Sequence, residues 1–154
     1  MASTVANVTL NVDVTESVML NGMDHGSTNS VAVTGVNEVS KRIMSLTANT
    51  DITLATFSTV PAAGQFVSAN VKYVRITNLD DANSCNINLG GAAENVWIYL
   101  DWGRSFILSQ PGSAIDAVAS GTVAVASLAD VTTITGNTAN ASNTIDVEVF
   151  IASS

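Results

Sequence analysis

The sequence predicts an all-β protein, a single-domain antiparallel β-sandwich of the jelly-roll kind. Three observations favour this class. Apolar and polar residues alternate with a period of two in several segments, no segment has a convincing helical period, and turn-forming residues recur about every 8 to 12 residues. The chain has 154 residues, which suits one domain with a self-sufficient core.

The composition limits the partners that the chain can have. Charged residues make up 12%, and 13 acidic against 5 basic residues give a net charge of −8. Without a Lys/Arg cluster beyond Lys41-Arg42, the chain cannot neutralise a run of phosphates, so no nucleic-acid partner is expected. The N-terminus lacks the pattern of a signal peptide, and no run of about 18 apolar residues occurs, so we expect synthesis in a cytoplasm and no membrane span.

The N-terminal segment predicts a strand followed by a loop. Even positions from Val8 to Leu20 are mostly apolar and odd positions mostly polar, so one face of this strand should be buried. Asn21–Ser30 is rich in turn formers, carries the single histidine and is predicted as an exposed loop. Residues 1–30 are therefore interpreted as a strand or arm with a loop, part of the same domain as the sandwich of residues 31–154.

The next segment predicts a short strand and a hairpin. A strand at Val31–Val33 should end at Gly35, and Val39–Leu46 should form a hairpin with Ile52–Phe57 across the polar turn at residues 47–51. Helix is the alternative for Asn37–Leu46, where the apolar spacing is partly helical.

The stretch Val71–Gly112 holds both tryptophans, both tyrosines and the only cysteine. A strand at Val71–Thr77 turns at residues 78–83, Cys85–Leu89 returns, and Gly90-Gly91 permits another reversal. In the following strand Val96, Ile98, Leu100 and Trp102 share one face, whereas Trp97 and Tyr99 share the other. This strand is therefore buried on both faces, or its second face meets another subunit.

The C-terminal part predicts further strands around a polar turn. A run at residues 105–108 ends at Gln110-Pro111-Gly112, and residues 114–129 are rich in small β-compatible side chains. Residues 132–134 precede a polar turn. The final strand, residues 144–152, alternates most regularly and should pair in the interior of a sheet.

No catalytic, cofactor-binding or metal-binding residues are predicted, and the chain is not expected to be an enzyme. The single Cys85 is interpreted as a small buried apolar group, and His25 as a solvated loop residue rather than a catalytic base. Asp101 among aromatic residues resembles a sugar subsite, but a strand ending in a polar turn is the simpler interpretation. Asp80-Asp81-x-Asn83 is either an Asx-type turn or the beginning of a calcium site.

Two arginines, Arg75 and Arg104, flank the aromatic strand in the sequence. Arginine and aromatic residues are enriched at interface hot spots, so these two are candidates for contact with a partner. The alternative is a surface arginine whose stem lies on a neighbouring ring.

Part of the central stretch resembles a module of small structural proteins of tailed bacteriophages. The resemblance rests on the segments Tyr73–Asp80, Asn86–Gly91 and Trp97–Leu100 and on the Leu108–Gly112 turn, and extends to the strand Ile145–Ile151. It implies a non-enzymatic β-sandwich that assembles on a virion after synthesis in the host bacterial cytoplasm, as a capsid decoration (cement) protein. A tail, neck or fibre position is the alternative within this class.

The resemblance implies the major capsid protein or other virion proteins as partners, and a homo-oligomer, with a trimer as the working assumption. From a different class, a carbohydrate-binding module could use Trp97, Tyr99 and Trp102 as a stacking platform. The predicted contact residues lie in an arm and on an aromatic face: Val5, Val8, Leu10, Arg75, Trp97, Tyr99 and Arg104.

Overall fold

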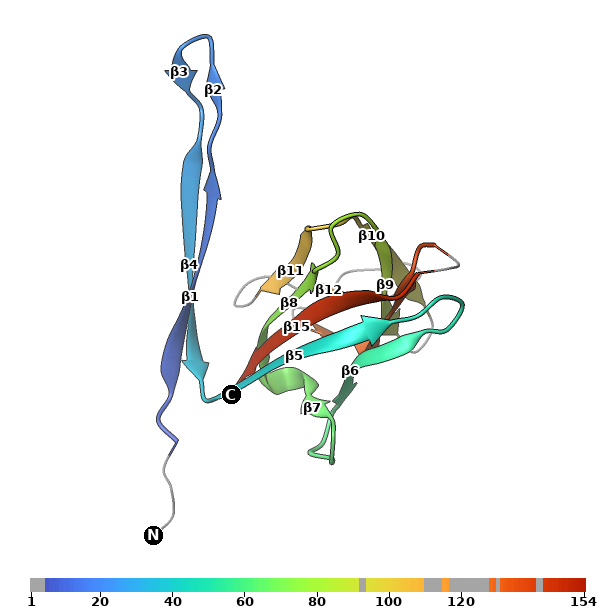
Figure 1. The fold of residues 1–154 in the computed structure, drawn as a ribbon. Coiled ribbons are helices and arrows are strands. Elements are labelled where there is room, and N and C mark those ends of the chain that lie inside the picture. Colours follow the sequence, from blue (N-terminus) through green and yellow to red (C-terminus); the bar gives the residue numbers. More distant parts are fainter. Residues whose placement is uncertain (1–4, 92–93, 110–114, 117–127, 130, 141–142) are drawn as a thin grey trace.

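The protein is described by a computed structural model, which places residues 5–91, 94–109, 115–116, 128–129, 131–140 and 143–154. Within these residues it consists of two packed β-sheets and a β-hairpin that projects from them (Figure 1). The predicted all-β sandwich is confirmed. The predicted Gln110-Pro111-Gly112 turn and most of the run at 114–129 lie outside the described residues.

The four-stranded sheet is antiparallel throughout. Its strand order is β11 (Ser105–Ser109), β8 (Val71–Asn78), β15 (Ile145–Ser153) and β5 (Glu38–Leu46). The final strand β15 therefore lies between two partners, which confirms the prediction of an interior position. Residues 38–46 form the strand β5, so the helical alternative for this segment is wrong.

The five-stranded sheet packs against the four-stranded sheet. Its order is β10 (Asn95–Leu100), β9 (Cys85–Gly91), β14 (Val131–Thr138), β6 (Ile52–Ser58) and β7 (Phe66–Val67). All pairs are antiparallel except β6 with β7. The 3₁₀ turn η1 (Ser68–Asn70) joins β7 to β8, and β12 (Ile115–Asp116) pairs with β13 (Leu128–Ala129) in parallel.

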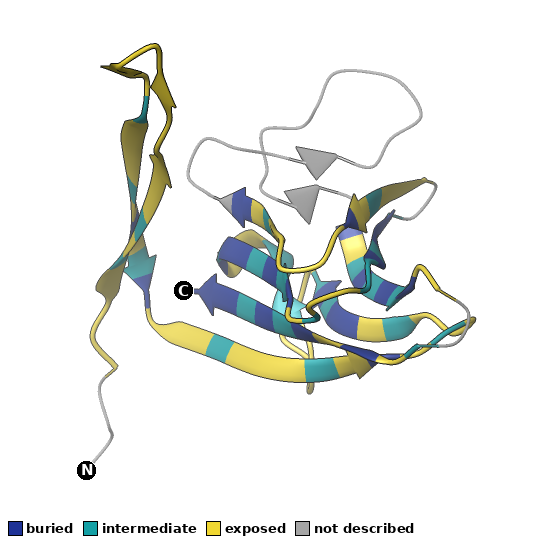
Figure 2. Ribbon diagram, turned by 45° about the horizontal axis from the view of Figure 1, so that its top comes forward, coloured by how far each residue is buried: buried dark blue, intermediate teal, exposed yellow. Residues whose placement is uncertain are grey.

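The core lies between the two sheets and contains the inward-facing side chains of both (Figure 2). Strand alternation supplies these side chains, because successive residues of a strand point to opposite faces. Full burial of each large aliphatic side chain contributes roughly 1.5 to 3 kcal/mol. Core residues that are at most 1% exposed include Leu46, Leu54, Ile76, Ile87, Leu89, Ile134, Val147 and Ile151.

The predicted hairpin of residues 39–46 and 52–57 is wrong. Its two strands exist, but β5 belongs to the four-stranded sheet and β6 to the five-stranded sheet. The intervening turn therefore carries the chain from one sheet to the other. A hydrogen bond connects these two strands: Nη2 of Arg42 in β5 donates to the carbonyl oxygen of Leu54 in β6 at 2.9 Å. Alternation of side chains predicts a strand but not its partner. It therefore could not distinguish a hairpin within one sheet from a turn that connects two sheets.

The turn at residues 78–83 is also a crossing between sheets, because β8 and β9 are not paired. The side chain of Asn78 is fully buried there and donates hydrogen bonds to the carbonyl oxygens of Asn83 and Leu100. A buried amide with these partners ties both ends of the crossing together. By contrast, β9 and β10 pair as a hairpin, so the predicted reversal exists, but Gly90 and Gly91 are paired residues of β9 and the chain reverses after them.

The first 36 residues differ from the prediction in their second half. The segment predicted as a loop, Asn21–Ser30, contains β3 (Met23–Asp24) and the beginning of β4 (Ser27–Val36), and it directly follows β2 (Met19–Leu20). The predicted break at Gly35 is wrong, because β4 continues through this residue with a φ of +75°, which glycine adopts without strain. The predicted division between residues 30 and 31 falls inside β4.

The buried Cys85 gives a direct test of the core. Burial raises the pKa of this thiol to about 11, so the thiolate is strongly disfavoured in the folded protein. We expect a chromogenic disulfide reagent to label Cys85 only as fast as the chain unfolds, and to label the denatured chain at once. The pKa of the Cys85 thiol is higher in the folded chain than in the unfolded chain, so the neutral thiol stabilises the fold at pH values below the unfolded-state pKa. This contribution to the free energy of unfolding is lost as the pH rises towards about 11. Rapid labelling of the native protein would contradict the burial of Cys85.

Candidate interaction surfaces

The projecting hairpin, here called the arm, is formed by residues 8–36. Strand β1 (Val8–Glu16) pairs antiparallel with β4, and the register places Leu10 opposite Val33 and Val12 opposite Val31. Alternation then gives the ribbon one mainly apolar face and one mainly polar face. The side chains of the apolar face, from the base outwards, are Val33, Leu10, Val31, Val12 and Val14.

The end of the arm is a tight turn with exposed apolar side chains. Asn21 and Gly22 have φ angles of +52° and +79°, the left-handed conformations that a two-residue hairpin turn requires. The turn connects β2 to β3, where Leu20 lies opposite Met23. We call this end of the arm, residues 18–23, the tip. Its four large apolar side chains are about half to two-thirds exposed: Val18, Met19, Leu20 and Met23.

The base of the arm packs on the outer face of the four-stranded sheet. Val33 and Val36 of β4 form a buried cluster with Tyr73 of β8 and Ala152 of β15. The rings of Tyr73 and Phe150 meet edge to face at 5.9 Å, an arrangement favoured by their quadrupoles. A two-stranded hairpin is marginally stable alone in water, so this apolar packing stabilises the direction of the arm.

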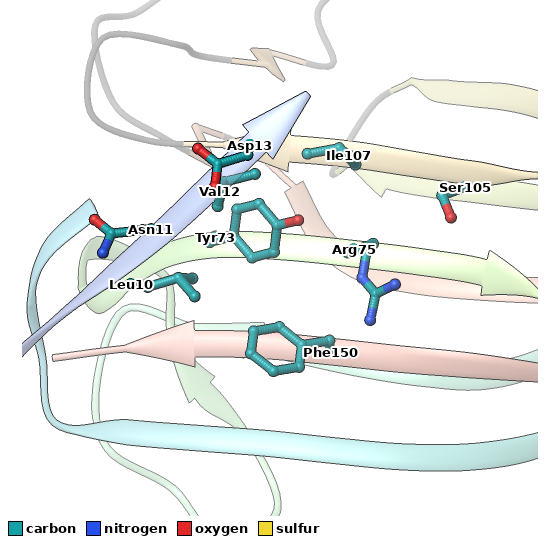
Figure 3. A pocket seen from close by; sticks show the side chains of 9 residues that line it. All are labelled: Leu10, Asn11, Val12, Asp13, Tyr73, Arg75, Ser105, Ile107 and Phe150. Atoms are coloured by element: carbon teal, nitrogen blue, oxygen red, sulfur yellow. The ribbon is translucent and has the colours of Figure 1, made fainter. Parts of the chain in front are cut away.

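A groove runs beside the base of the arm (Figure 3). It has a volume of about 410 Å³ and lies between β1 and the outer face of the four-stranded sheet. Of the two arm strands, only β1 contributes to its lining. The lining is both apolar and polar: Leu10, Asn11, Val12, Asp13, Tyr73, Arg75, Ser105, Ile107 and Phe150.

A charged network lies next to the groove. Glu148 of β15 forms ion pairs with Lys41 Nζ at 2.9 Å and with Arg75 Nη2. Arg75 also donates a hydrogen bond to Thr77 Oγ1, and its guanidinium lies 5.8 Å from the centre of the Phe150 ring. The hydrogen bond from Lys41 and the charges of Lys41 and Arg75 hold the pKa of Glu148 below its usual value. Arg75 is therefore held in position beside the arm.

A second surface lies on the opposite side of the sandwich. Trp97 and Tyr99 project outwards from the edge strand β10 and are 52% and 66% exposed. The hydroxyl of Tyr99 donates to Ser84 Oγ at 2.7 Å, and Ser84 Oγ donates to Asp101 Oδ1 at 2.8 Å. The hydrogen bond from Ser84, together with one from the Trp102 amide, lowers the pKa of Asp101. This chain of hydrogen bonds orients the Tyr99 ring on the surface.

Asparagine and threonine side chains continue this surface across the sheet. Asn86 Nδ2 donates to Asn137 Oδ1 at 3.1 Å, and Asn137 Nδ2 donates to Asp51 Oδ1 at 2.6 Å. In the neighbouring row the buried oxygens Asn88 Oδ1 and Thr135 Oγ1 have no hydrogen-bond partner within the described part of the chain. The outer face of the five-stranded sheet therefore combines an aromatic edge with neutral polar groups.

The structure does not bring the predicted contact residues together. Arg75 lies on the outer face of the four-stranded sheet, whereas Trp97 and Tyr99 lie on the outer face of the five-stranded sheet. Arg104 is exposed in the turn between β10 and β11. Trp102 lies beyond the end of β10, so its predicted place on the face of Val96 is wrong. The two faces are separate surfaces rather than one patch.

The predicted arm residues lie in different surroundings. Val5 and Val8 are exposed, whereas Leu10 is partly buried against the cluster at the base of the arm. Sequence reasoning missed the tip, because the turn formers at residues 21–30 were interpreted as a loop. The signal was available: Asn21-Gly22 between Met-Leu and Met is a short hairpin pattern.

The residues considered for catalysis or metal binding have other surroundings. His25 is exposed on the arm, close behind the tip. Asp80 Oδ1 accepts hydrogen bonds from the amides of Ala82 and Asn83 and from Asn83 Nδ2, as an Asx-type turn does. These bonds lower the pKa of the Asp80 carboxyl group, and the bond from the Ala82 amide has the largest effect. Among the described residues no three His, Cys, Asp or Glu side chains gather as metal ligands, and no helix has the length and apolarity to span a membrane.

Comparison of the chain with protein-family models, with curated proteins and with solved structures finds no match.

The ion pairs of Glu148 predict an acid-sensitive contribution to stability. Because the folded-state pKa of Glu148 is lowered, the contribution is present above the usual value of about 4.5 and is lost as the pH falls through the lowered value. We expect Glu148→Gln to lower the melting temperature at neutral pH, because the loss of each ion pair reduces the free energy of unfolding by about 1 kcal/mol or less. The difference from the wild type should shrink in acid.

Circular dichroism melts over a series of pH values measure this effect. The control is Asp146→Asn on the same strand, since Asp146 accepts a hydrogen bond from Ser45 but forms no ion pair within the described residues. A melting-temperature difference for Glu148→Gln that did not change with pH would show that the ion pairs contribute nothing.

Proposed function

We propose that the chain is a non-enzymatic structural protein of a virion, a capsid decoration protein that attaches to the outer shell and links neighbouring subunits. The observation that carries the proposal is the arm. It projects from the sandwich, its base is fixed by a buried cluster, and its tip presents four exposed apolar side chains to the surroundings.

The energetics of the arm favour an assembly role. Beyond Val31 and Val12, no residue of the ribbon belongs to an apolar cluster of the described body. Exposed apolar side chains gathered at the end of a projection are typical of a surface that another protein covers. A partner that buried the outer part of the arm, including the tip, would supply the apolar contact that a two-stranded ribbon lacks alone.

The virion setting rests on the resemblance of residues 71–113 and of the last strand to small phage structural proteins. A neutral Thr/Ser/Asn-rich surface and a charged fraction of only 12% suit a subunit that is packed among neighbours. Many copies on one shell would act together, so each contact needs only modest affinity. The partners proposed are the major capsid protein or other virion proteins; a tail, neck or fibre position is the alternative within this class.

Immunogold electron microscopy of particles from the source, with antibody raised against the recombinant chain, tests this proposal. We expect gold spread over the shell of intact particles. Gold confined to the tail or neck would contradict a decoration role and favour the alternative position. Particles without any gold, under conditions in which antibody labels the purified chain on the same grid, would reject the virion role.

The aromatic edge supports a second candidate, a carbohydrate-binding module. Trp97 and Tyr99 are side by side on one face of β10, and asparagine side chains beside them can exchange hydrogen bonds with hydroxyl groups. Their separation along the strand is about 7 Å, two residues apart, which allows both rings to contact one oligosaccharide. This surface lies on the opposite side of the sandwich from the arm base, so the two candidates do not compete for the same residues.

Affinity electrophoresis in gels that contain polysaccharide, together with a glycan array, measures this second candidate. If a glycan binds at the aromatic edge, Trp97→Ala should weaken binding by about tenfold or more, because a stacking ring is lost. Ile107→Ala, an exposed apolar residue on the other sheet, is the matched control and should leave binding unchanged. Absence of retention on every glycan tested would remove the candidate.

A further inference from the structure

We propose that the distal half of the arm binds in the groove of a second copy of this chain, so that copies join head to tail. The distal half comprises residues 14–27 and includes the tip; the groove is the 410 Å³ space beside β1. This inference rests on the assembly role of the arm proposed above, and it names the partner.

Only part of the apolar face of the arm is covered by the sandwich. At the base, Leu10, Val12, Val31 and Val33 pack with Tyr73, Phe150 and Ala152 on the four-stranded sheet. The same face continues outwards through Val14, which is 48% exposed, and through the polar Asn29, Glu16 and Ser27 to the exposed apolar side chains of the tip. Val14 and the tip therefore offer large apolar side chains of the kind that already packs on this sheet.

The groove is an uncovered part of the same sheet face. Its floor contains Tyr73 and Phe150, which already contact the base of the arm, together with Ile107, which is 41% exposed. Its wall is formed by residues 10–13 of β1, a strand that pairs only with β4 among the described strands, so its other edge is open to backbone hydrogen bonds with an incoming strand. An apolar strand or ribbon thus fits the groove better than a globular surface does.

The arm cannot fill its own groove. Its strands are paired from Val8 to Glu16 without a chain reversal, and the distal half leads away from the sandwich (Figure 1). Nine residues of strand span about 30 Å, so the tip lies well beyond the groove beside residues 10–13. A second molecule is therefore needed to bring a tip to the groove.

The charges restrict how the ribbon can lie. Glu16 is the charged residue on the apolar face of the distal half, where it accepts a hydrogen bond from Ser27 Oγ. Arg75 of the groove shares Glu148 with Lys41, so two cations face one carboxylate. Asp13 on the wall repels a second carboxylate. The incoming Glu16 should accordingly lie towards Arg75 and away from Asp13.

The contact joins different surfaces of the two copies, which makes it a heterologous interface. Such an interface closes into a ring or continues as a chain, depending on the rotation between copies. Arm and groove belong to every copy, so each molecule gives one tip and receives one.

Sedimentation velocity of the pure chain over a wide concentration range tests the inference without any particle. We expect concentration-dependent oligomers. Leu20→Asp at the tip and Ile107→Asp in the groove should each weaken association by at least about tenfold, because each places a carboxylate in an apolar contact. Val60→Asp, an equally exposed apolar position outside both surfaces, is the control and should associate like the wild type.

Mixing the two variants gives the decisive result. The Ile107→Asp chain keeps an intact tip and the Leu20→Asp chain keeps an intact groove, so their mixture should form heterodimers although neither variant associates alone. A wild-type chain that stays monomeric would overturn the inference, and so would oligomers that persist in Ile107→Asp, the result expected if arms pair with arms. A mixture that remains monomeric would overturn it as well.

The outcomes separate this inference from the proposed function. A chain that is monomeric in solution but labels the shell in electron microscopy leaves the virion role standing and rejects self-association through the groove. Circular dichroism melts of the three variants check their folds, and we expect melting temperatures close to that of the wild type because all three side chains are exposed.

Discussion

The packing of the arm base on the outer face of the four-stranded sheet is the contact on which the proposed assembly depends. Val33 and Val36 are buried there against Tyr73 and Ala152, although they belong to a ribbon that is otherwise largely open to solvent. Without this cluster, a ribbon of two strands would be marginal in water and free to move relative to the body. With it, the tip is presented in a defined direction.

The same contact gives the two faces of the sandwich different characters. The four-stranded sheet uses Tyr73, Phe150 and Ala152 to bury the arm base, and its remaining outer surface carries exposed Ile43 and Ile107 beside the ion pairs of Glu148. The five-stranded sheet has an outer face of asparagine and threonine with an aromatic edge. One face is thus suited to apolar strand packing, and the other to neutral hydrogen-bonding partners.

Separation of these faces matters for interpreting any binding experiment. Arg75 and the aromatic pair Trp97 and Tyr99 lie on opposite sides of the molecule, because the turn between β8 and β9 carries the chain from one sheet to the other. A substitution at Trp97 therefore reports on the aromatic edge alone, whereas substitutions at Leu20 or Ile107 report on the arm and the groove. The structure makes these tests independent, since residues without shared partners act additively.

The all-β class, the strands at residues 39–46, 52–57 and 71–77, the burial of Cys85 and the interior position of the strand at residues 144–152 could be predicted from the sequence, and the structure has each of them within one residue of the predicted bounds. These features follow from local alternation, which specifies which side chains share a face. That the turns at residues 47–51 and 79–84 cross between sheets, and that Asn21-Gly22 closes a long ribbon, is visible in the three-dimensional structure alone. It also placed Arg75 beside the arm and away from Trp97. Period-two alternation is identical for a strand paired in a hairpin and for one that enters the opposite sheet, so sheet membership depends on contacts between residues distant in the chain.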